Sequence, residues 1–185
     1  MGKVDLYIEP AGGKMSKINY LIKEWIVPIV VALIIVFFLN RFIFILVTVP
    51  TGSMIKTIEP GDKLFVSKLI DEDNLERKDI VVFNSEELDK ILVKRLVGLP
   101  GEKVYIDREG NVYVNEEKIE ESYAVKSTQE PQEFFVPDDS YFFLGDNRPN
   151  SRDARYWENP YINKKFIMGK AVFRFFPFTR IGRLK

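Results

Sequence analysis

Hydrophobic positions divide the chain into one long apolar run near the N-terminus and a larger region of short alternating segments. Fifteen residues from Trp25 to Leu39 pass without a charge. Because a membrane-spanning helix needs about 20 apolar residues, the pattern predicts a span over residues 21–41, with Arg41 at its far end. A buried helix of a soluble domain is one alternative. A cleaved signal peptide is another, although no small-residue cleavage site follows the run.

Charges beside the apolar run predict its orientation. Four lysines precede or begin the run, whereas Arg41 is the single cation near its other end, and an excess of cations favours the cytoplasmic side. We therefore expect residues 1–20 to be a cytoplasmic segment, residues 21–41 a single-pass anchor in the cell membrane, and residues 42–185 an extracytoplasmic domain. The four lysines are Lys3, Lys14, Lys17 and Lys23.

The region after residue 42 alternates short β-branched and aromatic runs with turn residues, which is typical of strands. We expect a mostly β, barrel-like domain of curled antiparallel sheets. The acidic, unpatterned residues 116–133 are expected to form a surface loop within a small cap over residues 102–140. One short helix is expected over Arg152–Tyr161. The predicted strands are Lys63–Ser67, Asp79–Phe83, Ile91–Val97, a hairpin over Lys103–Asn115, Ser140–Leu144 and Lys170–Phe176.

Composition narrows the chemistry because the chain has no cysteine and no histidine. This excludes a disulfide framework, a zinc-finger-type site, a thiol nucleophile and an imidazole base. The 27 basic residues balance the 27 acidic residues, and without a basic stripe we expect no nucleic-acid partner. We also expect no metal ion and no cofactor, so any enzyme here does acid–base chemistry with Asp, Glu, Lys, Tyr or Ser.

A lysine that serves as the base must lose its proton near neutral pH. Lowering its pKa by about 3 units takes roughly 4 kcal/mol of preference for the neutral amine, which burial supplies. Lys94 lies in the apolar run Ile91–Val97, where strand alternation puts it on one face with Leu92 and Leu96. Arg95, on the other face, is expected to meet water or a carboxylate. Taken alone, the local pattern fits an edge-strand charge that hinders aggregation better than a base.

A serine follows the first apolar strand at a turn. In the segment Val49–Met54, Gly52 allows a tight turn that exposes the Ser53 hydroxyl and neighbouring backbone N–H groups. Thr51 is placed to offer its hydroxyl to an oxyanion. A plain β-turn is the alternative interpretation of this segment.

The polar stretch from Leu144 to Arg155 is the second candidate for a functional segment. Its functional interpretation is a supporting network, in which Ser151 and Asp153 orient a lysine amine and Arg155 keeps Asp153 ionised. The alternative is a solvated loop that leads to a helix cap.

Four segments in this order resemble the motifs of bacterial type I signal peptidases. The resemblance covers about residues 20–183, and the short cap resembles the compact Gram-positive-like members. It implies the fold shared with self-cleaving repressors, and a membrane-anchored serine endopeptidase that cleaves signal peptides after small, Ala-x-Ala-like residues. The expected partners are secretory preproteins and the lipid bilayer, and we expect a monomer. The four segments are Pro50–Met54, Arg77–Phe83, Lys94–Gly101 and Gly145–Arg155.

Carried over residue by residue, the resemblance implies Ser53 as the acyl-forming nucleophile and Lys94 as the general base. The Thr51 hydroxyl and the Ser53 backbone N–H would then bind the oxyanion. The residues implied to support the lysine are Ser151, Asp153 and Arg155. The residues that match the family's shallow substrate pockets are Val47, Val49, Met54 and Val93, for which a place in the β core is the alternative.

Some positions depart from the family's usual pattern. Lys56 stands where proline is usual, and we expect a tolerated surface lysine; the alternative is a cation close enough to Lys94 to depress its pKa. Glu102 replaces a usual aspartate, Ala154 a usual serine, and Thr51 a frequent serine.

Competing functions remain open from the sequence. An anchored β domain without catalysis would be an interaction module. A self-cleaving repressor would carry a DNA-binding helix pair and no anchor, and neither feature is predicted here. Near the C-terminus, four aromatic residues are expected either to rest in the membrane interface or to pack in the core. They are Phe173, Phe175, Phe176 and Phe178.

Overall fold

The structure is a computed structural model that describes residues 22–71 and 73–184. The chain divides into two compact units, Met1–Arg41 and Phe42–Lys185. The predicted cytoplasmic segment, residues 1–20, lies outside the described residues.

A continuous helical run, Ile22–Ile43, makes up the described part of the first unit and includes the first two residues of the second. Its centre is the α-helix α2 (Val27–Phe38), flanked by two π-helical stretches, η1 (Ile22–Ile26) and η2 (Leu39–Ile43). No residue of α2 is buried, and the 22-residue run is long and apolar enough to cross a membrane. At 1.5 Å per residue a helix of this size is about 33 Å long, close to the thickness of a bilayer's hydrocarbon core. The prediction of one N-terminal apolar helix is confirmed.

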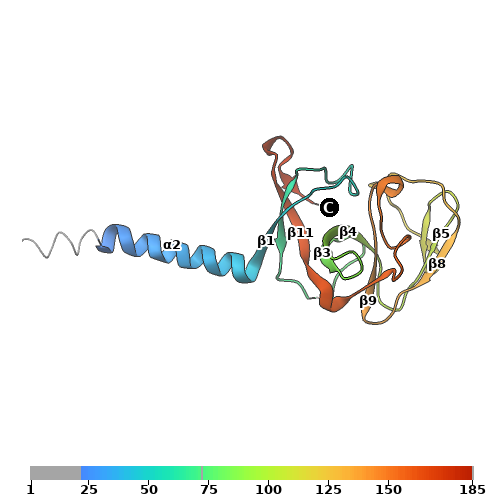
Figure 1. The fold of residues 1–185 in the computed structure, drawn as a ribbon, viewed down its shortest axis with the longest axis horizontal. Coiled ribbons are helices and arrows are strands. Elements are labelled where there is room, and N and C mark those ends of the chain that lie inside the picture. The colour runs from blue at the N-terminus through green and yellow to red at the C-terminus, as the bar shows by residue number, and fades with distance from the viewer. Residues whose placement is uncertain (1–21, 72, 185) are drawn as a thin grey trace, which may run out of the picture. The chain divides into compact units, whose positions relative to one another are not determined.

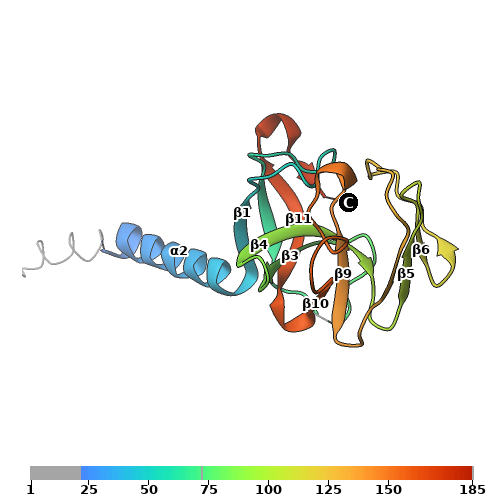
Figure 2. The same cartoon turned by 45° about the vertical axis from the view of Figure 1, so that its right-hand side comes forward.

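The second unit is built from two antiparallel sheets, which confirms the mostly β prediction (Figures 1 and 2). The larger sheet has eight strands in the order β1-β2-β11-β3-β4-β9-β10, with β12 paired to β11, and the smaller has the order β7-β6-β5-β8. The smaller sheet lies at the opposite end of this domain from β1 (Figures 1 and 2).

The strands have the following bounds: β1 (Phe44–Thr48), β2 (Lys63–Ser67), β3 (Ile80–Ser85), β4 (Lys90–Gly98), β5 (Lys103–Ile106), β6 (Val112–Val114), β7 (Glu117–Lys118), β8 (Gln132–Phe135), β9 (Ser140–Leu144), β10 (Tyr161–Asn163), β11 (Ile167–Phe176) and β12 (Gly182–Arg183). Three 3-10 turns join them: η3 (Arg148–Asn150), η4 (Lys164–Phe166) and η5 (Phe178–Arg180). Each predicted strand has a counterpart here, and β2 and β9 have the predicted bounds.

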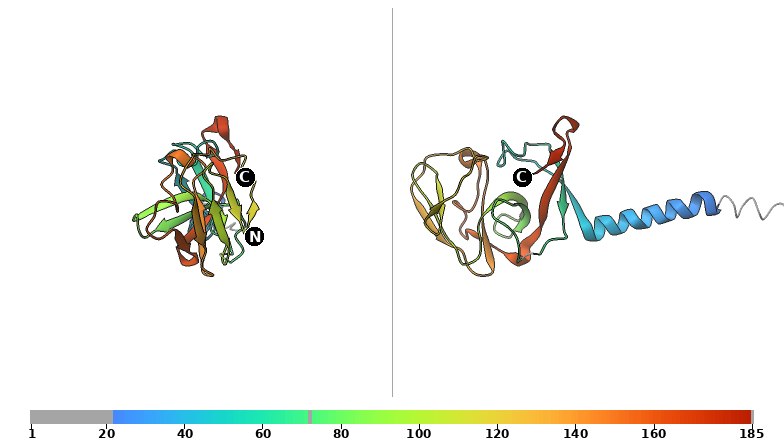
Figure 3. Two further views of the ribbon diagram at one scale, coloured as in Figure 1. Left: turned by 90° about the vertical axis from the view of Figure 1, so that its right-hand side faces the viewer. Right: turned by 180° about the vertical axis from the view of Figure 1, so that it is seen from behind.

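The long strands of the larger sheet curl around the core (Figure 3). Register shifts in β11, between Ala171 and Phe173 and again between Arg174 and Phe176, bend this strand where it pairs with β2. In the middle of the sheet β4 pairs with β3, so that Val81 lies opposite Lys94. The burial of β4 on both faces beyond Val93 follows from its central position in the sheet.

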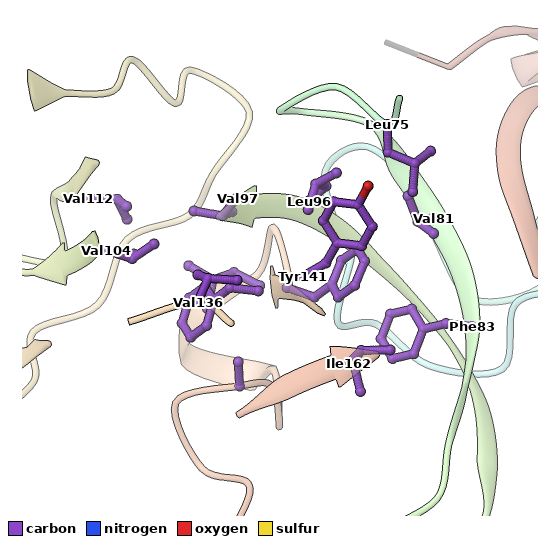
Figure 4. Close-up of a cluster of buried hydrophobic side chains, with 14 of the residues drawn as sticks. Leu75, Val81, Phe83, Leu96, Val97, Val104, Val112, Val136, Tyr141 and Ile162 are labelled. Carbon is purple, nitrogen blue, oxygen red and sulfur yellow. The ribbon is translucent and has the colours of Figure 1, made fainter. Parts of the chain in front are cut away.

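Two apolar clusters hold the domain together. The larger one joins residues of both sheets, among them Phe83 of β3 and Val104 of β5 (Figure 4). The ring of Phe83 stacks on that of Phe143 in β9, with ring centroids 4.5 Å apart. The smaller one contains Val49, Met54 and Ile58 together with residues of β2, β3 and β11. Met54 and Ile58 therefore anchor the turn after β1 in the core by burying apolar surface.

The predicted helix over Arg152–Tyr161 is wrong. Residues 154–159 form turns, and β10 begins at Tyr161. The backbone here is tied to other segments, since the Ala154 N–H donates to the Phe143 carbonyl. The Asp153 carboxylate does not cap a helix, because it accepts a hydrogen bond from the Gly145 N–H. Pro160 further disfavours helical geometry in the residue before it.

The expectation of a surface loop over residues 116–133 is wrong in part. The segment is mostly irregular, with β7 near its start and β8 beginning at its end. However, Glu121 is only 6% exposed, and Val125 forms a parallel bridge with Asn147. The segment is partly buried because Glu121 forms an ion pair with the buried Arg148.

The C-terminal aromatic residues divide between the two expected environments. Phe173 and Phe175 are half-buried and their ring centroids lie 6.4 and 4.6 Å from that of Phe65. Phe176 and Phe178 are 40% and 77% exposed. The first pair thus belongs to packing within the sheet, and the second pair is available to an apolar environment outside the domain.

Two glycines on the β11 side test the close packing of the sheet. A Cβ on Gly169 would lie 2.3 Å from the Ser67 carbonyl oxygen of β2, whereas a Cβ on Gly182 meets nothing within 4 Å. We predict that Gly169→Ala lowers the free energy of unfolding by about 1–3 kcal/mol because a backbone atom must shift, and that Gly182→Ala changes it by less than about 0.5 kcal/mol. Urea unfolding of the full chain in nonionic detergent measures both, and equal midpoints for the two variants would contradict the packing argument.

Candidate active site

Ser53 lies on a tight turn that follows β1. Backbone hydrogen bonds from the Thr57 and Ile58 N–H groups to the Met54 carbonyl, 2.9 and 2.8 Å long, close the turn. Met54 is 1% and Ile58 0% exposed. The buried side chains and the hydrogen-bonded backbone hold Ser53 in one position, although it belongs to no helix or strand.

A second segment fixes the carbonyl side of this turn. The Asn147 N–H donates to the Ser53 carbonyl over 2.9 Å, and Asn147 Nδ2 donates to the Gly52 carbonyl over 3.0 Å. Gly145 allows the two segments to meet, because a Cβ at this position would lie 2.6 Å from the Ser53 carbonyl oxygen and 2.1 Å from Ser151 Oγ. A side chain at residue 145 is therefore incompatible with the observed arrangement.

Lys94 is buried in the centre of β4 with 3% of its surface exposed. Its Nζ donates a hydrogen bond of 3.0 Å to Ser151 Oγ. Among the described residues, the amine makes this hydrogen bond to Ser151 and none to Ser53. Burial lowers the pKa of Lys94 to about 8, because removing the ammonium from water disfavours the charged form.

Nearby charges act on Lys94 in opposite directions. Asp153 raises its pKa, Arg155 lowers it, and Asp146 raises it, each by less than burial lowers it. Asp153 and Arg155 are also paired with each other, at 2.8 Å from Nε to Oδ1 and 3.0 Å from Nη2 to Oδ2. The guanidinium thereby offsets the carboxylate that would otherwise restore the lysine's charge. The exposed Lys56 is not among the charges that shift this pKa.

Ser53, Lys94 and Thr51 all line one cavity of about 440 Å³ between β1, its following turn and the first half of β4. The four predicted pocket residues also lie in its wall: Val47, Val49, Met54 and Val93. The other lining residues are Ile45, Leu46, Thr48, Pro50, Lys90, Ile91, Leu92 and Met168. Ser151, Asp153 and Arg155 do not line the cavity, but Ser151 accepts from the Lys94 amine and the charges of Asp153 and Arg155 act on it. The structure thus brings every predicted site residue to one region.

Two hydrogen-bond donors beside the candidate nucleophile, the Ser53 N–H and the Thr51 hydroxyl, have no acceptor within the described part of the chain. Thr51 is exposed, and Ser53 is 8% exposed. Both groups are therefore free to bind an acceptor that enters the cavity.

A larger cavity of about 610 Å³ lies elsewhere, beside β10 and the turn between β3 and β4. It contains Ser85, Ser140 and one lysine, Lys165. Lys165 is exposed, whereas Lys94 is buried. Ser140 donates to Asp139, and the Ser85 hydroxyl accepts from the Leu88 N–H. This cavity lacks a desolvated base and is not the better candidate.

Sequence reasoning gave no role to several residues that shape the site. Arg95, expected to meet water or a carboxylate, is 1% exposed and forms a bidentate pair with Asp146 at 2.8 and 2.7 Å. The Thr57 hydroxyl donates to the same carboxylate over 2.5 Å, and the ring of Tyr123 lies 3.9 Å from the Arg95 guanidinium. The local sequence around Thr57 and Tyr123 does not indicate these contacts, because their partners, Asp146 and Arg95, lie far away along the chain.

No group of three or more acidic, histidine or cysteine side chains that could hold a metal ion occurs within residues 22–71 and 73–184. The donor groups in the cavity wall are a serine, two threonines and two lysines. These groups suit proton transfer and hydrogen bonding to a peptide.

Comparisons with known proteins identify the family of the chain. Residues 22–176 match the family model described as signal peptidase, peptidase S26. Signal peptidase I P of Bacillus subtilis subsp. natto is 36% identical over 184 residues, covering 93% of this chain and 97% of the relative. Signal peptidase I T of Bacillus subtilis is 34% identical over 174 residues, covering 88% of this chain and 89% of the relative.

A crystal structure of a signal peptidase I from Enterococcus faecalis is also similar, with 30% sequence identity and a TM-score of 0.43, covering 52% of this chain and 96% of that one. The family match spans most of the chain, and the two Bacillus relatives are similar over nearly their whole length. The chain therefore belongs to the signal peptidase family, peptidase S26, and is a serine peptidase of the signal peptidase I type.

Proposed function

We propose that this chain is a membrane-anchored endopeptidase that removes signal peptides from exported preproteins, with Ser53 as nucleophile and Lys94 as general base. The observation that carries the proposal is that both side chains line the same cavity while Lys94 is almost fully desolvated. A pKa of about 8 leaves a usable fraction of neutral amine near neutral pH. No imidazole competes for the role, because the chain has no histidine.

In the proposed reaction the Ser53 hydroxyl attacks the scissile carbonyl carbon, and Lys94 accepts the hydroxyl proton. The C–N bond then breaks, the ammonium of Lys94 returns the proton to the leaving amine, and the signal peptide remains as an ester on Ser53. Water attacks the ester with Lys94 again as base, releasing a carboxylic acid and the free serine. The amine must move from its hydrogen bond with Ser151 toward Ser53 or share its protons between them.

Oxyanion stabilisation is proposed for the Ser53 N–H and the Thr51 hydroxyl. Both residues line the cavity, and neither donor makes a hydrogen bond to another described residue. Preorganised donors of this kind stabilise charge that develops in the transition state. The hydrogen bond from Asn147 to the Ser53 carbonyl keeps the backbone of the turn in position while the charge forms.

Ser151, Asp153 and Arg155 are proposed to position Lys94 rather than to touch the substrate. Ser151 accepts the hydrogen bond that directs the amine. Asp153 anchors the Gly145 N–H over 2.9 Å, which keeps Ser151 and the Ser53 turn in register. Arg155 neutralises Asp153 and so prevents that carboxylate from stabilising the ammonium form of the base.

The apolar walls set the proposed specificity for small residues. Val47, Val49, Met54 and Val93 surround a cavity of about 440 Å³ shared by several substrate residues. Side chains such as alanine fit shallow apolar depressions of this kind, whereas larger ones would contact the walls. Substrates with Ala-x-Ala-like ends before the scissile bond are the expected preproteins.

The apolar helix is the proposed anchor. Residues 1–20 would then be cytoplasmic, residues 21–41 would span the membrane, and residues 42–185 would form the extracytoplasmic catalytic domain, with the cap over residues 102–140. The bilayer would be a partner of the exposed Phe176 and Phe178 as well as of the helix. We propose that the chain acts as a monomer.

Substitutions at the two central residues test this function. We predict that Ser53→Ala and Lys94→Ala each lower preprotein cleavage by more than about a thousandfold, measured with the full chain in nonionic detergent. The exposed lysine in Lys56→Ala provides the matched control and is expected to retain activity within about twofold. Cleavage by either of the first two variants at the wild-type rate would disprove the proposed mechanism.

The lowered pKa of Lys94 predicts the pH dependence. Because only the neutral amine acts as base, kcat/KM should rise about tenfold per pH unit below a pKa of about 8 and level off above it. Lys56→Gln should leave this limb in place, since Lys56 does not contribute to the shift. A limb near the ordinary lysine pKa of 10.5, or one that moves in Lys56→Gln, would be inconsistent with this site.

Burial of Lys94 also predicts a stability cost. Lowering its pKa from 10.5 to about 8 corresponds to about 3 kcal/mol against the charged form. The cost is fully present below pH 8, where Lys94 is charged in both states, and is lost between pH 8 and 10.5, where only the unfolded chain binds the proton. Lys94→Met should therefore be about 1–3 kcal/mol more stable than wild type at pH 7. Urea titrations of both proteins should show that the difference in their free energies of unfolding is smaller at pH 10 than at pH 7. An equal difference at both pH values would contradict a stability cost from burying the charged amine.

A further inference from the structure

The cavity that holds Ser53 has a second end, which the proposed chemistry does not use. Ile45 and Leu46 of β1 and Lys90 and Ile91 of β4 line it there. Lys90 begins β4 and Lys94 follows four residues later. At about 3.3 Å per residue this is roughly 13 Å along the strand. The second end is therefore several substrate residues away from the scissile bond.

Among the described residues that line this end of the cavity, Lys90 is the charged one. It is one of two lysines in the wall, and unlike Lys94 it is exposed. In the described part of the chain no carboxylate lies within ion-pair distance of its ammonium. The nearby acidic residues of the β3–β4 turn are exposed, and the carboxylate of one, Glu87, accepts from the Asn159 N–H. The ammonium is thus available to a ligand.

The surroundings of Lys90 are apolar. Leu46 and Ile91 are 55% and 56% exposed beside it. A lysine stem covers apolar surface of this kind while its ammonium stays in water. An extended peptide in the cavity would contact the apolar wall with its own aliphatic groups and meet the ammonium with a polar side chain.

Chain connectivity gives the direction of the substrate, and this step rests on the proposed function. Strand β1 begins at Phe44, directly after Ile43, the last residue of the apolar helix. The cavity end at Ile45 is therefore the end closest along the chain to the anchor. A signal peptide holds its own apolar segment in the same bilayer, on the N-terminal side of the scissile bond. It would enter from this end and run in the direction of β1 and β4.

We propose that Lys90 is a specificity-determining residue that binds an acidic side chain of the signal peptide about four to six residues before the scissile bond. The spacing follows from the offset of four positions between Lys90 and Lys94 and from the reach of the lysine side chain. The ligand is a carboxylate of Asp or Glu, and a lysine at the same substrate position is repelled.

A set of otherwise identical preproteins tests the proposal. Glu, Gln, Leu or Lys is placed at the fifth residue before the cleavage site, and kcat/KM is measured with the full chain in nonionic detergent. Wild type should cleave the Glu substrate about three- to tenfold faster than the Lys substrate, with Gln between them, as expected for an exposed charge pair. Lys90→Glu should reverse this order, and Lys90→Gln should remove it.

Lys118→Glu is the charge-matched control, because Lys118 is exposed on β7 in the smaller sheet, away from the cavity. It should keep the wild-type order. The proposal is overturned if the order is the same in Lys90→Glu as in wild type, if Lys118→Glu reverses it as well, or if Leu is the best residue in every variant. These outcomes leave the proposed function intact, which fails separately if Ser53→Ala cleaves the same substrates.

Discussion

The burial of one amine is the constraint on which the rest of the site depends. Lys94 is 3% exposed, and its lowered pKa corresponds to about 3 kcal/mol of preference for the neutral form. The domain can bear this cost because Lys94 lies in a central strand whose neighbours are buried. The same burial makes the amine a stronger candidate for a base than any exposed lysine. Stability and proposed activity therefore pull in opposite directions at this residue.

Three segments far apart in sequence meet around this amine: the turn that carries Ser53, strand β4 and the loop at residues 145–155. Gly145 is the point of closest approach, because it leaves room for both the Ser53 carbonyl and Ser151. Asn147 then ties the loop to the turn through its backbone and its side chain. A small shift of one segment would displace the other two, because hydrogen bonds join them and tolerate only a narrow range of distances and angles.

Most strands of the fold and the position of Lys94 in a buried strand could be predicted from the amino-acid sequence. Alternation placed Lys94 on a buried strand face, and the strand runs gave most of the sheet, because both depend on local patterns. The helix over Arg152–Tyr161 was wrong because Asp153 and Arg155 satisfy each other and the backbone at Gly145 instead of facing solvent. Glu121 is buried by an ion pair with Arg148, which a polar composition does not reveal. Such polar contacts join residues that are distant in sequence, so a local sequence pattern does not predict them.

Pairing of the buried charges explains why burial prevails over the carboxylates near Lys94. Asp153 and Asp146 both raise the pKa of the amine, and unpaired they would favour the ammonium strongly in a low-dielectric interior. Each is instead bound by an arginine, Asp153 by Arg155 and Asp146 by Arg95. Each guanidinium offsets the carboxylate that it binds, so the desolvation of Lys94 sets the direction of its pKa. Replacing Arg155 by a neutral residue would therefore do more than remove a contact, because it would remove a positive charge that lowers the pKa of Lys94.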